Sequence, residues 1–142
     1  MVDSVLSITG LNIPPYSNRG ATQTLEPIEQ SKQTRRTING VLRDLALSEF
    51  QKFRSVITCD DQRPLAFSDV WPGKELTVDC IVEFAYLTAG GAAQRPVVPG
   101  SSYVEGDYTF YRPRLTMRLV EWTNAFDEYA ANVPWSVTME EI

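Results

Sequence analysis

The chain has 142 residues, of which 43% are hydrophobic, and it carries a formal net charge of −5. This length and composition predict one globular domain with a single core. The acidic balance argues against a protein that binds nucleic acid by neutralising phosphates, because such a protein shows a basic excess on one face. The two dense basic spots, Arg35-Arg36 and Arg112-Pro113-Arg114, are therefore interpreted as solvated or interface arginines.

The sequence also limits the cellular setting. No window approaches the roughly 18 consecutive apolar residues of a membrane span, and the first residues lack the basic-then-apolar pattern of a signal peptide. We therefore expect no membrane span and no export by that route. Two cysteines are too few for a disulfide framework, and Cys59 and Cys80 are expected to be buried free thiols rather than a bonded pair.

Residues 1–32 contain scattered aliphatic side chains without a sustained period, and glycines and prolines interrupt them. We expect an extended N-terminal arm that either folds back on its own domain or lies on a partner. The number of aliphatic residues favours a partner, and Leu11, Ile13 and Tyr16 are the arm residues expected at an interface. Removing residues 1–20 should then weaken assembly more than folding.

Residues 33–142 are expected to form a single β domain. Asn39-Gly40 separates two short segments and supplies the residue types of a type I′ turn, which predicts a tight hairpin. Residues 46–53 are compatible with one short helical turn that Ser48 caps, before a strand over residues 54–59. A loop follows, and three apolar side chains are expected to pin it to the fold: Leu65, Phe67 and Val70.

The longest regular pattern covers residues 74–86, where even positions are apolar and odd positions are mostly polar or small. This period of two predicts an antiparallel strand with one face on the core, and Trp71-Pro72-Gly73 supplies the turn before it. The strand would span roughly 43 Å at about 3.3 Å per residue, which is long for a small domain. We expect its first half, through Val82, to lie in the core. The second half should project as a hairpin, with Phe84 and Tyr86 available to a neighbouring subunit.

Small and flexible residues follow the long strand and predict a projecting loop near residues 87–102, where Gly90, Gly91 and Arg95 are further candidates for an interface. The alternating pattern resumes over residues 107–122.

Proline cannot donate a hydrogen bond to a strand ladder. Pro113 therefore marks an edge, a bulge or a corner at which the strand changes sheets.

Residues 124–132 are compatible with a short capped helix, and the alternation from Trp135 onward predicts a final strand. The total is about six or seven strands with one or two short helices. No helix of ten residues separates successive strands, as a parallel sheet would require, which favours an antiparallel fold over an α/β fold. The expected class is a mainly antiparallel β-sandwich or β-barrel.

The sequence offers little catalytic chemistry. It contains no histidine, which removes Ser-His-Asp and Cys-His catalysis and most zinc sites. Asp60-Asp61 is a candidate calcium site, and Glu140-Glu141 or Asp127-Glu128 are candidate acid pairs for glycoside hydrolysis. Adjacent acids are more often solvated turn residues, so we expect no enzyme, no metal and no cofactor.

Aromatic residues invite a second interpretation, because flat rings stack on sugars. The residues concerned are Trp71, Trp122, Trp135, Tyr103, Tyr108 and Tyr111. In a β domain of this size such side chains usually fill the core or an interface, which is the interpretation that we favour.

Several segments together resemble the small virion proteins of tailed bacteriophages, namely compact β-sandwich proteins of the tail, baseplate or neck. The resemblance covers roughly residues 18–142 and is carried by the extended arm, the Asn39-Gly40 hairpin after Arg35-Arg36, and three further stretches: Trp71-Pro72-Gly73 with the strand after it, Tyr111 to Met117, and Trp135 to Glu141. It carries over no catalytic or cofactor residue.

Such a family implies a homo-oligomeric subunit of a ring or tube, assembled in the bacterial cytoplasm, whose arm and loops reach neighbouring virion proteins. It also implies an acidic lumen along which DNA slides without sequence-specific binding, with which the net charge of −5 agrees. The alternatives are a monomeric carbohydrate-binding module and a head decoration protein.

Overall fold

The computed structural model describes residues 6–14, 17, 19–129 and 131–142. Tyr16, one of the residues expected at an interface, lies outside this range. The described part is mainly β and its strand pairs are antiparallel, as predicted. It has eleven strands in three sheets and two short 3-10 helices, which exceeds the six or seven strands expected.

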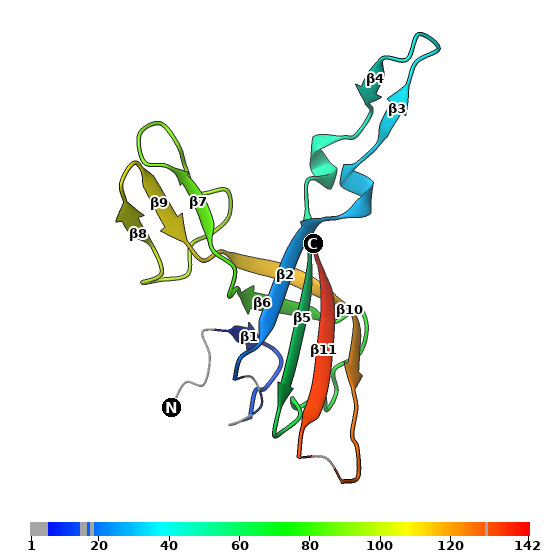
Figure 1. The fold of residues 1–142 in the computed structure, drawn as a ribbon, viewed down its shortest axis with the longest axis vertical. Helices are drawn as coiled ribbons and strands as arrows, with labels where there is room; N and C mark the ends of the chain where they lie inside the picture. Colours follow the sequence, from blue (N-terminus) through cyan, green and yellow to red (C-terminus); the bar gives the residue numbers. More distant parts are fainter. Residues whose placement is uncertain (1–5, 15–16, 18, 130) are drawn as a thin grey trace.

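The largest sheet has six strands in the order β1-β6-β10-β11-β5-β2 (Figure 1). Their bounds are Ser7–Thr9 for β1, Glu75–Asp79 for β6, Arg114–Asn124 for β10, Val133–Glu141 for β11, Phe53–Asp61 for β5 and Thr22–Pro27 for β2.

Strand β10 bends this sheet. Its first part, Arg114 to Arg118, pairs with β6, while Met117 to Asn124 pairs with β11. The register shifts between Leu119 and Glu121, and such a bulge bends a strand and increases its twist. As a result, β6 and the start of β10 run across the direction of β11, β5 and β2 (Figure 1).

The core lies in the concavity of the bent sheet, because alternate residues of each strand face it. Its buried members come from both parts of the sheet and from the loops that cover it: Leu6, Ile8, Leu11, Ile57, Cys59, Leu65, Val70, Leu76, Val78, Cys80, Leu115, Met117, Leu119, Trp135, Val137 and Met139. The two edge strands, β1 and β2, each pair on one side only. The described sheet is therefore bent but not closed into a barrel.

The run of residues 74–86 divides between two sheets. Strand β6 ends at Asp79, and β7 (Phe84–Leu87) belongs to a small sheet of order β7-β9-β8, with β8 at Tyr103–Glu105 and β9 at Tyr108–Tyr111. The core half was expected to reach Val82, which is wrong. The N–H groups of Ile81 and Val82 donate to the side chain of Gln23, at 2.7 and 3.4 Å, instead of to a neighbouring strand.

Pro113 stands where the chain passes from the small sheet to the large one. It is fully buried between β9 and β10, which lie in different sheets. Of the three roles predicted for this proline, the corner between sheets is therefore confirmed.

A hairpin projects from the end of the large sheet (Figure 1). It consists of β3 (Thr34–Arg36) and β4 (Leu42–Asp44) and stands between the 3-10 helices η1 (Glu29–Ser31) and η2 (Ser48–Phe50). The tight hairpin is confirmed, but its turn is not type I′, because Gly40 has a positive φ and Asn39 does not. The Thr37 carbonyl accepts from the Gly40 N–H, which gives a three-residue loop ending in a left-handed glycine.

The described part of the N-terminal segment, residues 6–14, 17 and 19–32, folds back on its own domain, which is the first of the two placements expected. Strand β1 pairs with β6, and Leu11 is only 3% exposed, so Leu11 is a core residue of this chain. Further along, the indole of Trp135 donates to the carbonyl of Ser17 at 2.7 Å. Because these contacts are part of the core, removing residues 1–20 should weaken folding itself.

Two other expectations have clear outcomes. The helix over residues 124–132 does not form in its described part, because β10 continues to Asn124 and the short segment left buries neither Phe126 nor Tyr129.

Cys59 and Cys80 are buried and free, as predicted. Burial raises the pKa of Cys80 to about 12. No helix in the described ranges is long and apolar enough to cross a membrane.

A pair of substitutions separates core residues from exposed ones. Leu11→Ala should lower the free energy of unfolding by about 2 to 5 kcal/mol, because it empties a buried position. Ile38→Ala, at the fully exposed tip of the hairpin, should change it by less than about 0.5 kcal/mol. Urea unfolding monitored by tryptophan fluorescence measures both. Equal effects would contradict the placement of Leu11 in the core.

Candidate interaction surfaces

Two of the acids considered for catalysis or calcium binding are held by arginines. The carboxylate of Asp61 accepts from the guanidinium of Arg19, at 2.9 and 3.2 Å, and from its backbone N–H at 2.8 Å. These hydrogen bonds hold the pKa of Asp61 below its usual range. The described residues contain no group of three or more side chains able to hold a metal ion.

Glu141 accepts two hydrogen bonds from Arg95, at 2.6 and 2.9 Å, and its carboxylate also accepts from the Phe53 N–H. The guanidinium lies 5.1 Å from the centre of the Phe53 ring and donates to the carbonyl of Gln51. Both groups of this ion pair are largely buried. Arg95, predicted as an interface residue, therefore joins the loop after β7 to strands β5 and β11 of its own chain.

Phe84 and Tyr86 join the same cluster. The Phe84 ring lies 5.3 Å from that of Phe53 and 6.0 Å from that of Tyr111, and Tyr86 lies 5.9 Å from Tyr111. The loop of residues 88–102 also folds back here, since the N–H of Gln94 donates to the Tyr111 hydroxyl. The rings of Phe84, Tyr86 and Tyr111 on this inner face are therefore engaged in contacts within the chain.

The remaining predicted residues have local roles. Ile13 is half-buried and packs against the core. Gly90 has a φ of +85° in the turn after β7, and an added Cβ at Gly91 would lie 2.4 Å from the carbonyl oxygen of Leu87. Both positions therefore require glycine for the backbone of the turn. The structure brings Phe84, Tyr86 and Arg95 together and leaves Leu11 in the core.

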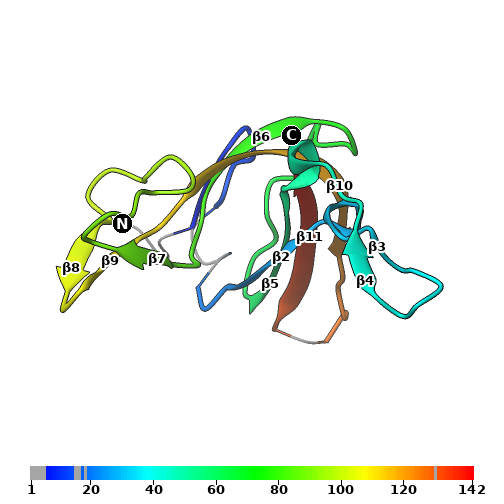
Figure 2. The ribbon, with the colours of Figure 1, turned by 90° about the horizontal axis from the view of Figure 1, so that it is seen from above.

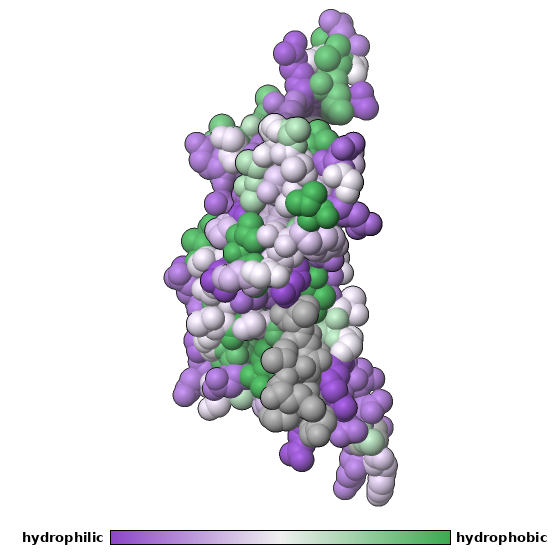
Figure 3. All heavy atoms as spheres, turned by 90° about the vertical axis from the view of Figure 1, so that its left-hand side faces the viewer, coloured by the Kyte–Doolittle hydropathy of each residue, from purple (hydrophilic) through white to green (hydrophobic). Residues whose placement is uncertain are grey.

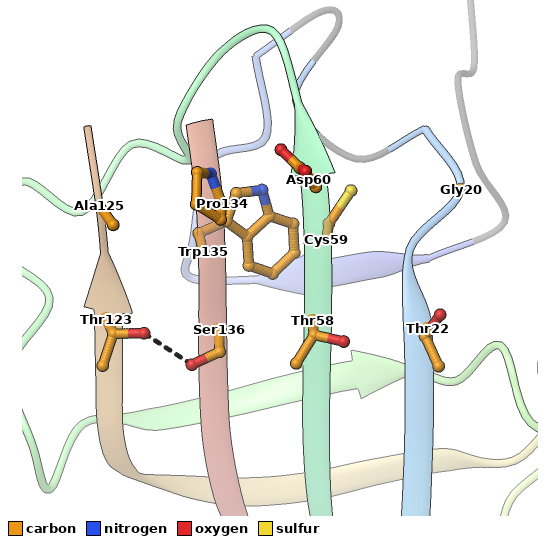
Figure 4. Close-up of a pocket in the computed structure, with 10 residues that line it drawn as sticks. All are labelled: Gly20, Thr22, Thr58, Cys59, Asp60, Thr123, Ala125, Pro134, Trp135 and Ser136. Carbon is orange, nitrogen blue, oxygen red and sulfur yellow. Dashed lines mark hydrogen bonds between the residues drawn. The ribbon is translucent and has the colours of Figure 1, made fainter. Parts of the chain in front are cut away.

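A shallow hollow of about 530 Å³ lies at one end of the large sheet and is lined from β2, β5, β10 and β11 (Figure 4). The register aligns four hydroxyl side chains across these strands: Thr22, Thr58, Ser136 and Thr123. The hydroxyls of Thr123 and Ser136 are 2.7 Å apart. The hollow contains no arrangement of nucleophile and base, and its exposed hydroxyls provide a polar outer face.

The aromatic residues divide into structural and exposed ones. Trp135 and Tyr111 are buried, and Trp122 stacks on Phe67 with centroids 4.1 Å apart while its indole donates to the carbonyl of Val70. The expected pinning of this loop is thus confirmed. Three of the six stay exposed: Trp71 at 70%, Tyr103 at 47% and Tyr108 at 51%.

Tyr103 and Tyr108 lie on the outer face of the small sheet. The pairing places Tyr103, Phe110 and Ala85 in one row across the sheet, and Glu105, Tyr108 and Leu87 in the next. Glu83 is two residues before Ala85 and bonds to the hydroxyl of Tyr103, which raises the pKa of that tyrosine. We call these seven residues the aromatic face: Glu83, Ala85, Leu87, Tyr103, Glu105, Tyr108 and Phe110.

The second exposed apolar surface is the β3–β4 hairpin with its flanks. None of the interface residues predicted from the sequence lies in it. Its large apolar side chains are exposed: Ile38, Val41, Leu42, Leu45, Leu47 and Phe50. Hydrophobic atoms accordingly appear over the projecting end of the molecule in Figure 3. A signal was present in the sequence, because Val41, Leu42 and Leu45 place apolar residues on both faces of a short hairpin.

The Asp61 ion pair predicts a dependence of stability on pH. Its pKa is lower in the folded chain than the value of about 3.9 in unfolded chains, so its contribution is present above about pH 4 and is lost as the pH falls through the folded pKa. Asp61→Asn should lower the free energy of unfolding by about 1 to 3 kcal/mol at pH 7. The difference in the free energy of unfolding between Asp61→Asn and wild type should become smaller toward pH 3.

Asp60→Asn is the matched control, because this adjacent acid is exposed and should change stability by less than about 0.5 kcal/mol. Urea unfolding at pH 7, 5 and 3 measures each variant. A difference between Asp61→Asn and wild type that stays constant over this range would contradict the assigned ion pair.

Comparison with known proteins gives no match. No protein-family model, no curated protein and no solved structure is similar to the chain. The surfaces described above are therefore what supports a proposal about its function.

Proposed function

We propose that the chain is a structural subunit of a tailed-phage virion, belonging to the tail, baseplate or neck, that assembles with copies of itself into a ring or tube. The observation that carries this proposal is the projecting β3–β4 hairpin, whose apolar side chains are left uncovered by the rest of the chain. Exposed apolar patches of this kind mark sites of protein association.

The exposed apolar area of the hairpin favours association when a partner covers it. At about 25 cal/mol per Å², covering exposed side chains of the size of leucine and isoleucine favours association by about 1 to 2 kcal/mol each. The hairpin stands clear of the large sheet, so it reaches a neighbouring molecule without any rearrangement of the core (Figures 1 and 2). A second copy is the partner that a self-assembling ring or tube supplies.

The interior supports a role in assembly rather than catalysis. The candidate acids Asp61 and Glu141 are engaged by Arg19 and Arg95. The overall charge of −5 suits a lumen along which DNA slides without binding, since like charges repel. In this proposal the subunit uses no cofactor and acts through its surfaces.

One observation favours a second candidate. The exposed rings of Tyr103 and Tyr108 lie on one face of the small sheet, which is the arrangement that a sugar-binding module uses. A monomeric carbohydrate-binding module is therefore the alternative that the experiment below must exclude.

The size of the protein in solution tests both candidates. Analytical ultracentrifugation over a concentration series should show reversible oligomers, and negative-stain electron microscopy should show rings or tubes. The double variant Ile38→Ser/Leu45→Ser should shift assembly to concentrations about tenfold higher or more, with an unchanged unfolding midpoint.

Phe126→Ser is the control, because it removes an equally exposed apolar side chain from the loop between β10 and β11, far from the hairpin (Figure 1). It should leave assembly unchanged. A protein that stays monomeric at the highest concentration and binds an oligosaccharide on a glycan array would overturn the proposal in favour of the sugar-binding module.

A further inference from the structure

The β3–β4 hairpin contains a like-charged pair that the chain does not compensate. Arg35 of β3 lies directly opposite Arg43 of β4, and both are exposed. Like charges at opposite positions destabilise a strand pair. No ion pair that the structure shows in its described part involves either guanidinium.

Apolar side chains flank this pair on the same face of the hairpin. Val41 and Leu45 are two residues before and after Arg43, so they share its side of the strand. Backbone hydrogen bonds extend the ladder to both positions, since the N–H of Thr37 donates to Val41 and the N–H of Leu45 donates to Gln33. This face therefore presents two cations between two exposed apolar groups.

The aromatic face has the opposite character. Its centre consists of Tyr103, Tyr108, Phe110 and Leu87, and two acids lie at its periphery: Glu83 directly before β7 and Glu105 at the end of β8. Both acids are exposed, and no ion pair in the described residues uses either of them. The face therefore presents two anions around an apolar centre, which complements the hairpin in charge and in polarity.

The net charges of the two parts agree with this complementarity. Residues 32–45 carry four cations and Asp44, a net charge of +3: Lys32, Arg35, Arg36 and Arg43. Because the whole chain has −5, the remainder carries −8 (−5 minus +3). A basic projection on an acidic body favours contact between the projection of one copy and the body of another.

The hairpin and the small sheet lie on opposite sides of the molecule in two perpendicular views (Figures 1 and 2). The hairpin cannot therefore cover the aromatic face of its own chain. A contact between two different patches is heterologous, and repeating it produces a ring when the rotation closes or a filament when it does not.

We propose that the β3–β4 hairpin of one copy docks on the aromatic face of the next, with Arg35 and Arg43 pairing with Glu83 and Glu105. This contact rests on the proposed function, because it requires that the chain assembles with itself. It specifies which two surfaces meet and makes the association directional, since each copy offers one hairpin and one face.

A charge exchange tests the contact. Arg35→Glu/Arg43→Glu and Glu83→Arg/Glu105→Arg, each in the full chain, should each raise the concentration for half-assembly about tenfold or more, measured by analytical ultracentrifugation at low salt. All four residues are exposed, so the unfolding midpoint should stay near that of wild type. Arg63→Glu, at another exposed loop position, is the control and should assemble as wild type does.

Mixing the two double variants in equal amounts should restore assembly, because the reversed hairpin of one then meets the reversed face of the other. A chain that carries all four substitutions should also assemble. A merely structural defect in either variant would not be repaired by mixing.

The results separate a failure of the docking contact from a failure of the proposed function. If wild type assembles while both double variants assemble equally well, or if mixing does not restore assembly, the hairpin does not dock on the aromatic face and the proposed function stands. If wild type stays monomeric at every concentration, the docking and the proposed function are both overturned.

Discussion

Strand β10 pairs with both β6 and β11, which run in different directions, and this double pairing determines the shape of the large sheet. It follows buried Pro113, where the chain leaves the small sheet, pairs with β6 through Arg118, and pairs with β11 from Met117 onward, on both sides of its bulge. A flat strand would carry all its partners in one plane. The bulge between Leu119 and Glu121 bends the sheet, so alternate residues of both parts face one concavity and build a single core.

Several side chains that were candidates for catalysis or for an interface also stabilise the fold. Arg95 and Glu141 form a largely buried ion pair, and the Phe84 ring of the small sheet packs on Phe53 of the large one. A buried charge without a partner destabilises the folded state, and the Glu141 carboxylate is paired with the guanidinium of Arg95. The Arg19–Asp61 pair does the same for the N-terminal segment at the other end of β5.

The two exposed apolar surfaces described above differ in the sign of their charge. The β3–β4 hairpin is basic with exposed aliphatic groups, while the aromatic face of the small sheet is acidic around its rings. Each is costly alone: the hairpin holds Arg35 opposite Arg43, and both expose apolar area to water. Contact between copies would place anions beside Arg35 and Arg43 and would remove the apolar area of both surfaces from water.

Local patterns in the sequence predicted the β class, the Asn39-Gly40 hairpin, a final strand from Trp135 and the buried free cysteines, and they limited Pro113 to an edge, a bulge or a corner. These features depend on alternation, on turn residues and on the missing N–H of proline, which act over a few residues. Only the tertiary structure decided that β6 ends at Asp79, because the side chain of Gln23 from a distant strand takes the N–H groups of Ile81 and Val82. It also decided that Leu11, Phe84 and Arg95 serve the interior, since their partners are far away in the sequence and no local pattern records them.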